Sequence, residues 1–72
     1  MVEPLIEPLS RRELEILELL AMRLSNQEIG ERLYITVPTV KTHISHICQK
    51  LDVKGRYVAV ARARALGILP TK

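Results

Sequence analysis

One stretch of the sequence repeats its apolar residues at the spacing of an α-helix. Between Thr36 and Leu51 these residues stand three or four positions apart, which places them along one side of a helix. The members of this stripe are Val37, Val40, Ile44, Ile47 and Leu51. A half-buried β-strand would instead alternate every second residue. The stretch therefore predicts a helix over residues 37–51 with one buried side.

The side opposite this stripe is polar and uncharged at its centre, with positive charge at its borders. At about 100° per residue, the centre holds Pro38, Thr42, Ser45 and Gln49. Lys41 borders one edge, and the residues toward the other edge are Thr39, His43, His46 and Lys50. A helix face that meets only water more usually carries Glu and Lys. Small hydrogen-bonding side chains beside cations favour a polar, negatively charged partner, and DNA is the leading candidate.

Length and composition restrict the chain to one small all-α domain. Seventy-two residues provide one core at most. An apolar share of 47% with only two aromatic residues, Tyr34 and Tyr57, supplies aliphatic side chains suited to packed helices. No apolar run is long enough for a membrane span, no signal peptide opens the sequence, and the single cysteine, Cys48, fits a reducing compartment. We therefore expect a cytoplasmic protein.

Charge is divided unevenly along the chain. Residues 1–36 hold four Arg and seven Glu, a net charge of −3. Residues 37–72 hold seven Lys or Arg and a single acidic residue, Asp52, a net charge of +6. Positive charge is thus concentrated in the half that contains the polar-faced helix. This distribution is typical of a phosphate-binding surface, although ordinary surface solubility would also account for it.

Capping signals divide the chain into helices. Residues 1–8 contain two prolines and no periodicity, so we expect a lead-in there. Ser10 with Glu13 and Ser25 with Glu28 have the spacing of capping boxes, in which each side chain bonds the other residue's amide. Each pair is followed by an apolar-periodic stretch. The two boxes therefore predict two helix starts.

The second and third helices are separated by a turn of about four residues, which predicts a helix-turn-helix. Thr36 is a suitable N-cap for the third helix, and Pro38 falls in its first turn. Gly30 inside the second helix indicates close approach of another helix backbone, and Gly67 can end the fourth helix in the left-handed conformation. We expect a compact four-helix domain over residues 9–69, a tail at 70–72, and helices at about 11–23, 26–33, 37–51 and 56–66.

The fourth helix has more apolar surface than one buried side requires. One side carries Ala59, Ala63 and Leu66, and the other carries Tyr57, Val58, Ala61 and Ala65. We expect one set to join the core and the other, which is left available, to form a small helix-to-helix dimer contact. The alternative is that alanines on this helix are simply tolerated at a solvent-exposed surface.

Short motifs follow one another in a fixed order through nearly the whole domain. They are Leu9-Ser10, Arg12-Glu13, Glu15-Ile16-Leu17, Ser25-Asn26-Gln27-Glu28-Ile29, Leu33, Ile35-Thr36, Thr39-Val40-Lys41-Thr42-His43-Ile44, Ile47, Lys50-Leu51, Val53, Arg56, Ala59-Val60, Ala63 and Leu66-Gly67. Over residues 9–69 the chain resembles the LuxR-type, or GerE-type, helix-turn-helix DNA-binding domain. Its lead-in and its Ala-Arg-Ala-Leu-Gly-Ile-Leu ending are most similar to the C-terminal domains of MalT-like transcriptional regulators.

This resemblance implies a bacterial regulator of transcription, a class that includes response regulators. It implies a third helix in the major groove and a dimer on a pseudo-palindromic DNA site, with the fourth helix supplying the dimer contact through Tyr57, Val58, Ala61 and Ala65. The base-reading positions that it implies are Pro38, Lys41, Thr42 and Ser45. We expect double-stranded DNA and a second copy of the chain as partners, a nucleoid-associated location, and neither a cofactor nor a small-molecule ligand.

The expected phosphate contacts have two sources. Lys50 and Lys54 match basic positions of the family that lie near phosphates. Helix N-termini bind anions through their free amides, which adds residues at the starts of the second and third helices. Thr39 and His43 lie beside the polar side of the third helix and are added to this set. The expected residues are Ser25, Asn26, Gln27, Thr36, Thr39 and His43.

Other classes of function are less well supported. His43 and His46, with Cys48 nearby, suggest a metal site, but Cys48 points about 160° away from His46 around the helix and no fourth ligand is evident. No nucleophile–base set, phosphate-binding glycine loop or carboxylate pair indicates an enzyme. The remaining alternative is a protein-interaction module that binds RNA polymerase or another regulator through Tyr57, Val58 and Ala61.

Overall fold

The computed structural model describes residues 8–70 of the chain. This part consists of four α-helices: α1 (Arg11–Ala21), α2 (Asn26–Leu33), α3 (Val37–Leu51) and α4 (Arg56–Ala65). The predicted all-α fold with four helices is therefore confirmed. Within the described residues no helix has the length and apolar content needed to cross a bilayer. Most of the expected lead-in, residues 1–7, and residues 71–72 of the expected tail lie outside the described residues.

The helix starts are those that the capping signals predict. The Glu13 amide donates to Ser10 Oγ over 3.1 Å, and the Ser10 amide donates to Glu13 Oε1 over 2.9 Å. Ser25 and Glu28 form the same reciprocal pair, at 2.7 and 3.1 Å. Thr36 accepts a hydrogen bond from an amide in the first turn of α3. Each cap satisfies amides that would otherwise lack a partner at the helix start.

Helix α1 ends two residues earlier than predicted. Arg23 adopts the left-handed conformation, with φ of 67°. Its amide donates to the Leu20 carbonyl over 2.9 Å, and the Leu24 amide donates to the Leu19 carbonyl over 3.2 Å. This pair of bonds is a Schellman motif, which turns the chain out of the helix. The sequence gives no signal for this exact end, because glycine is the usual residue at such a turn and an arginine stands there.

Helix α4 ends at Ala65, one residue before the predicted position. Gly67 takes the predicted left-handed conformation, with φ of 80°. The Ile68 amide then bonds the Ala63 carbonyl over 2.8 Å, so the chain folds back on the last turn. The prediction of a glycine-terminated helix is confirmed.

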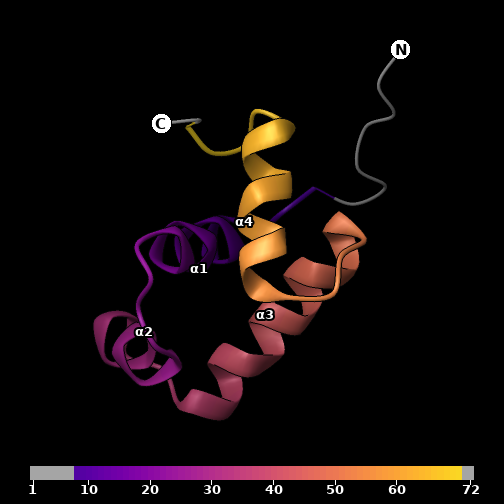
Figure 1. The fold of residues 1–72 in the computed structure, drawn as a ribbon. Helices are drawn as coiled ribbons and strands as arrows, with labels where there is room; N and C mark the ends of the chain where they lie inside the picture. Colours follow the sequence, from indigo (N-terminus) through magenta and orange to yellow (C-terminus); the bar gives the residue numbers. More distant parts are fainter. Residues whose placement is uncertain (1–7, 71–72) are drawn as a thin grey trace.

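Helix α3 is the centre of the packing. It contacts α1, α2 and α4, and α1 also contacts α4. In Figure 1, α2 and the N-terminal half of α3 lie at the lower end of the molecule, and α4 stands at the upper end. The predicted stripe on α3 is buried at Val40, Ile44, Ile47 and Leu51, while Val37 is half-buried. The rest of the core consists of Ile16, Leu17, Leu19, Leu20, Ile29, Ala59, Val60, Ala63 and Leu69.

Gly30 is required by a turn and not, as predicted, by another helix backbone. A Cβ atom at this position would lie 2.6 Å from the carbonyl oxygen of Ile35 and 3.7 Å from a methyl group of Val40. The same turn is held by a hydrogen bond from the Ile35 amide to the Gly30 carbonyl, 2.9 Å long. The glycine therefore allows the chain to reverse tightly between α2 and α3.

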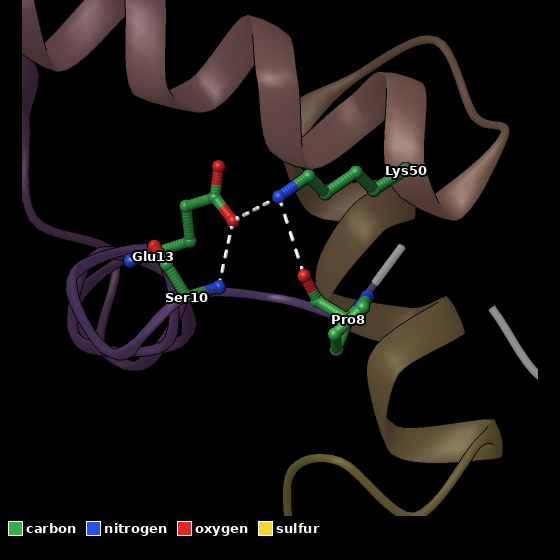
Figure 2. Close-up of polar contacts among 4 residues, drawn as sticks. All are labelled: Pro8, Ser10, Glu13 and Lys50. Atoms are coloured by element: carbon green, nitrogen blue, oxygen red, sulfur yellow. Dashed lines mark hydrogen bonds and ion pairs between the residues drawn. The ribbon is translucent and has the colours of Figure 1, made fainter. Parts of the chain in front are cut away.

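An ion pair joins the start of α1 to the end of α3 (Figure 2). Lys50 Nζ lies 2.9 Å from Glu13 Oε1 and donates to the Pro8 carbonyl over 3.3 Å. Glu13 is only 5% exposed. Burial raises the pKa of this carboxyl, but the Ser10 amide and Lys50 outweigh it and hold the pKa of Glu13 below its usual range. Glu13 therefore stabilises both its own helix start and the last turn of α3.

Candidate nucleic-acid interface

The four residues expected to read bases are all exposed on one side of α3. They are Pro38, Lys41, Thr42 and Ser45. The Thr42 hydroxyl donates to the Pro38 carbonyl over 3.1 Å. Its proton is therefore engaged, and Thr42 presents an acceptor oxygen and a methyl group to a partner. Lys41 and Ser45 supply the hydrogen-bond donors of this face.

The starts of α2 and α3 carry the expected anion-binding groups. Ser25 and Gln27 are exposed, and Asn26 is half-buried. Thr36 and Thr39 are exposed as well, and their hydroxyl oxygens lie 2.9 Å apart in a hydrogen bond. Free amides at a helix N-terminus together with such hydroxyls can hold a phosphate.

The two lysines expected near phosphates differ in their surroundings. Lys54 is exposed in the loop after α3. Lys50 is held by Glu13 and Pro8, and its side chain is only 20% exposed. Within residues 8–70 the ion pairs are Lys50–Glu13 and one between neighbouring α1 side chains. Lys41 and Lys54 therefore have no carboxylate partner among the described residues.

His43 is half-buried and His46 is exposed on α3. Cys48 donates a weak hydrogen bond to the Gly55 carbonyl over 3.7 Å. In the part of the chain that the structure describes, no three His, Cys, Asp or Glu side chains are placed to hold a metal ion. The expected contact of His43 with a phosphate stays a prediction.

The apolar side of α4 expected to contact a second copy is exposed. Tyr57 and Val58 are 42% and 54% exposed, and Ala61 and Ala65 are exposed as well. The opposite side enters the core through Ala59, Val60 and Ala63. The expectation that one of the two sets joins the core is confirmed for Ala59 and Ala63, and Leu66 is half-buried.

Two surface features have no signal in the sequence. The Arg23 guanidinium carbon lies 4.1 Å from the centroid of the Tyr57 ring, a cation–π contact between the α1–α2 loop and α4. Tyr34 is 94% exposed at the end of α2 and adopts the left-handed conformation, with φ of 61°. Sequence spacing could not find the first feature because its partners are distant along the chain. Tyr34 is an aromatic residue where glycine or asparagine is usual.

Comparison with known proteins identifies the domain. The sequence pattern of the bacterial regulatory proteins of the luxR family matches residues 7–63. The transcriptional regulatory protein LiaR of Bacillus subtilis (strain 168) is 56% identical over 57 residues, which cover 79% of this chain and 27% of LiaR. The response regulator VraR of Staphylococcus aureus (strain Mu3 / ATCC 700698) is 52% identical over 59 residues, which cover 82% of this chain and 28% of VraR.

Solved structures agree with the sequence relatives. The response regulator ChrA of a heme-sensing two-component system superposes with a TM-score of 0.86 at 42% identity, over 93% of this chain and 33% of ChrA. The transcription factor GerE superposes with a TM-score of 0.82 at 41% identity, over 89% of this chain and 96% of GerE.

The chain spans less than a third of the length of LiaR and of VraR. These relatives do not test the expected likeness to MalT-like regulators. LiaR and GerE are named as regulators of transcription, so the prediction that the chain is not an enzyme is confirmed by its family. The fold, the sequence pattern and these relatives agree, and the chain therefore belongs to the luxR family of bacterial regulatory proteins, as a DNA-binding transcription regulator domain.

Proposed function

We propose that this domain binds double-stranded DNA in a sequence-specific manner, as a homodimer with α3 of each copy in the major groove. The observation that carries the proposal is the outer face of α3. Thr42 and Ser45 are exposed there as small polar side chains, and Lys41 stands beside them with no carboxylate partner among residues 8–70. A major groove about 12 Å wide admits a helix with such a face.

Base reading is assigned to the N-terminal half of α3. Lys41 donates to guanine O6 or N7, which are the usual acceptors for lysine in the major groove. Thr42, whose proton is bonded to Pro38, contacts a thymine methyl group or accepts from an exocyclic amine. Ser45 donates or accepts according to the base, and Pro38 provides an apolar contact. With one long side chain in the set, DNA shape contributes to the choice of site.

Phosphate contacts position the domain on the duplex. We assign them to the starts of α2 and α3, to His43 and to Lys54. The residues at the two helix starts are Ser25, Asn26, Gln27, Thr36 and Thr39. The Lys50 ammonium is bonded to Glu13 and Pro8. We therefore propose that its main role is to orient α3, and that a direct phosphate contact is secondary.

The dimer contact is assigned to the exposed side of α4. Tyr57, Val58, Ala61 and Ala65 form a small apolar surface there, and a two-fold axis through it brings two α3 helices to successive major grooves. The site is then pseudo-palindromic, with half-sites about 10 base pairs apart. We further propose that the domain acts at the bacterial nucleoid in the cytoplasm, as part of a response regulator similar to LiaR and VraR.

Titration with generic duplex DNA at two salt concentrations tests DNA binding. Affinity should fall steeply with salt, and Lys41→Glu should abolish binding. Arg11→Glu makes the same charge change at the start of α1, where Arg11 is exposed, and should retain most of the affinity. Absence of wild-type binding at low salt, or equal losses in the two variants, would refute the proposal.

Selection of bound sequences from a random duplex pool tests the symmetry of the site. A pseudo-palindrome with half-sites about 10 base pairs apart supports the dimer. A single half-site, combined with a monomer in sedimentation both free and on DNA, refutes it.

The exposed apolar side chains of Tyr57 and Val58 also support an alternative function. A protein-interaction module would use this surface to bind RNA polymerase or another regulator. This alternative predicts that Tyr57 and Val58 are required for activity while duplex DNA is not bound at any salt concentration. The two titrations above therefore separate it from DNA binding.

A further inference from the structure

We propose that Arg23 is a positioning residue for the dimer surface. Its guanidinium holds the Tyr57 ring in one orientation, so that the proposed dimer surface on α4 is preorganised before a second copy of the chain binds. This inference rests on the proposed function, because it requires the dimer contact through Tyr57 and Val58.

The first support is the contact itself. The Arg23 guanidinium carbon lies over the Tyr57 ring at 4.1 Å from its centroid, well inside the range at which a cation is attracted to an aromatic face. One face of the ring is thereby covered, while the residue stays 42% exposed. Val58, the next residue of α4 and also part of the proposed dimer surface, is 54% exposed.

The second support is the backbone of Arg23. The residue has φ of 67° and closes α1 in a Schellman motif. Glycine adopts this conformation without steric strain, whereas a residue with a Cβ atom is strained there. The backbone alone would therefore be served better by glycine. What the arginine adds at this position is its side chain, and the contact that this side chain makes is with Tyr57.

The third support is the place of Arg23 in the chain. It lies two residues before Ser25, the N-cap of α2, where phosphate contacts are proposed. Tyr57 lies in the first turn of α4, on the proposed dimer surface. The contact therefore joins the loop before α2 to the first turn of α4, which carries the proposed dimer surface.

Arg23 is expected to act on the free domain, before a second copy of the chain binds. A tyrosine side chain that is free to rotate loses its freedom when a dimer forms, and this weakens association. Arg23 removes that loss by ordering the ring beforehand. Because a two-fold dimer contains two such rings, loss of both contacts should weaken cooperative binding to a full site by roughly tenfold.

The test compares a selected full site with a duplex that carries one half-site. Arg23→Gly should leave half-site affinity unchanged and should reduce cooperativity on the full site by roughly tenfold. Arg23→Lys retains a cation and should restore part of the cooperativity. Glycine suits the backbone at this position, so the variant is expected to fold, and its unfolding midpoint checks this.

A double-mutant cycle identifies the partner of Arg23. In a Tyr57→Leu background the ring is absent, so Arg23→Gly should have no further effect on cooperativity. A spectroscopic measurement accompanies the cycle. Because Tyr34 and Tyr57 are the two tyrosines and tryptophan is absent, Tyr34→Phe leaves Tyr57 as the single source of the near-ultraviolet tyrosine signal. That signal should weaken with Arg23→Gly.

The outcomes are separable from those of the proposed function. If wild-type protein does not bind DNA, or the selected site is not symmetric, the proposed function fails. If wild type binds a symmetric site cooperatively and Arg23→Gly retains full cooperativity, the role of Arg23 is refuted. It is also refuted if the Arg23→Gly effect is the same with and without the Tyr57 ring.

Discussion

Glu13 and Lys50 join the first turn of α1 to the last turn of α3 through an ion pair 2.9 Å long. The same carboxylate oxygen accepts the Ser10 amide that closes the capping box. One oxygen of a nearly buried side chain thus fixes both a helix start and the orientation of the proposed reading helix (Figure 2).

Glu13→Gln should destabilise the domain by about 1–3 kcal/mol, since a charge-assisted hydrogen bond to Lys50 is replaced by a weaker neutral one. The pKa of Glu13 is lowered in the folded protein, so its charge stabilises the fold above the ordinary glutamate pKa. This stabilisation is lost as the pH falls through the lowered value. Urea unfolding should therefore show the widest gap between wild type and variant near pH 7, narrowing below about pH 4. A gap that stays constant between pH 7 and pH 3 would contradict this assignment.

Lys50→Gln and Lys54→Gln should separate a structural lysine from a phosphate contact. Lys54→Gln should leave the unfolding free energy within about 0.5 kcal/mol of wild type, because Lys54 is exposed. It should reduce the slope of log affinity against log salt by about one unit. Lys50→Gln should destabilise the fold with a smaller change in slope. Matched salt titrations and unfolding curves measure both quantities, and a reversal of this pattern would show that Lys50 is the phosphate ligand.

Gly30→Val should destabilise the domain by about 1–3 kcal/mol, because a Cβ atom at this position meets the Ile35 carbonyl oxygen at 2.6 Å. Glu31→Val is the matched control, since it places the same β-branched side chain at the next, exposed position of α2. Thermal unfolding followed by circular dichroism compares the two. Equal midpoints would show that the turn between α2 and α3 shifts without strain.

Tyr34→Gly should stabilise the domain by about 0.5–1 kcal/mol, because it relieves a left-handed conformation that tyrosine adopts poorly. The Tyr34 side chain is 94% exposed, so little packing is lost. Tyr34→Ala keeps the Cβ atom and should give no comparable gain. Guanidinium unfolding midpoints for the three proteins test the difference, and a loss of stability in both variants would mean that the ring supports the fold.

Local interactions explain why the helix starts could be predicted. Ser10 and Glu13, like Ser25 and Glu28, lie three residues apart, so each box is visible in the sequence and is present in the structure. The apolar stripe of α3 is equally local. Its period fixes which side is buried, and it therefore also fixes the outer face that carries Lys41.

Contacts between distant residues explain what could not be predicted. The early end of α1 depends on Arg23, whose left-handed backbone and contact with Tyr57 have no counterpart in sequence spacing. Lys50 has the positive charge of a phosphate-binding residue, and only folding brings it to Glu13. The reason for Gly30 likewise lies in the turn carbonyl that approaches it.

The hydrogen bond from Lys50 to the Pro8 carbonyl also sets the path of the chain that enters the domain. This path passes the last turn of α3, about 18 Å along the helix axis from Pro38 at the reading end. The chain therefore enters the domain at the end of α3 that is remote from the proposed base-reading residues.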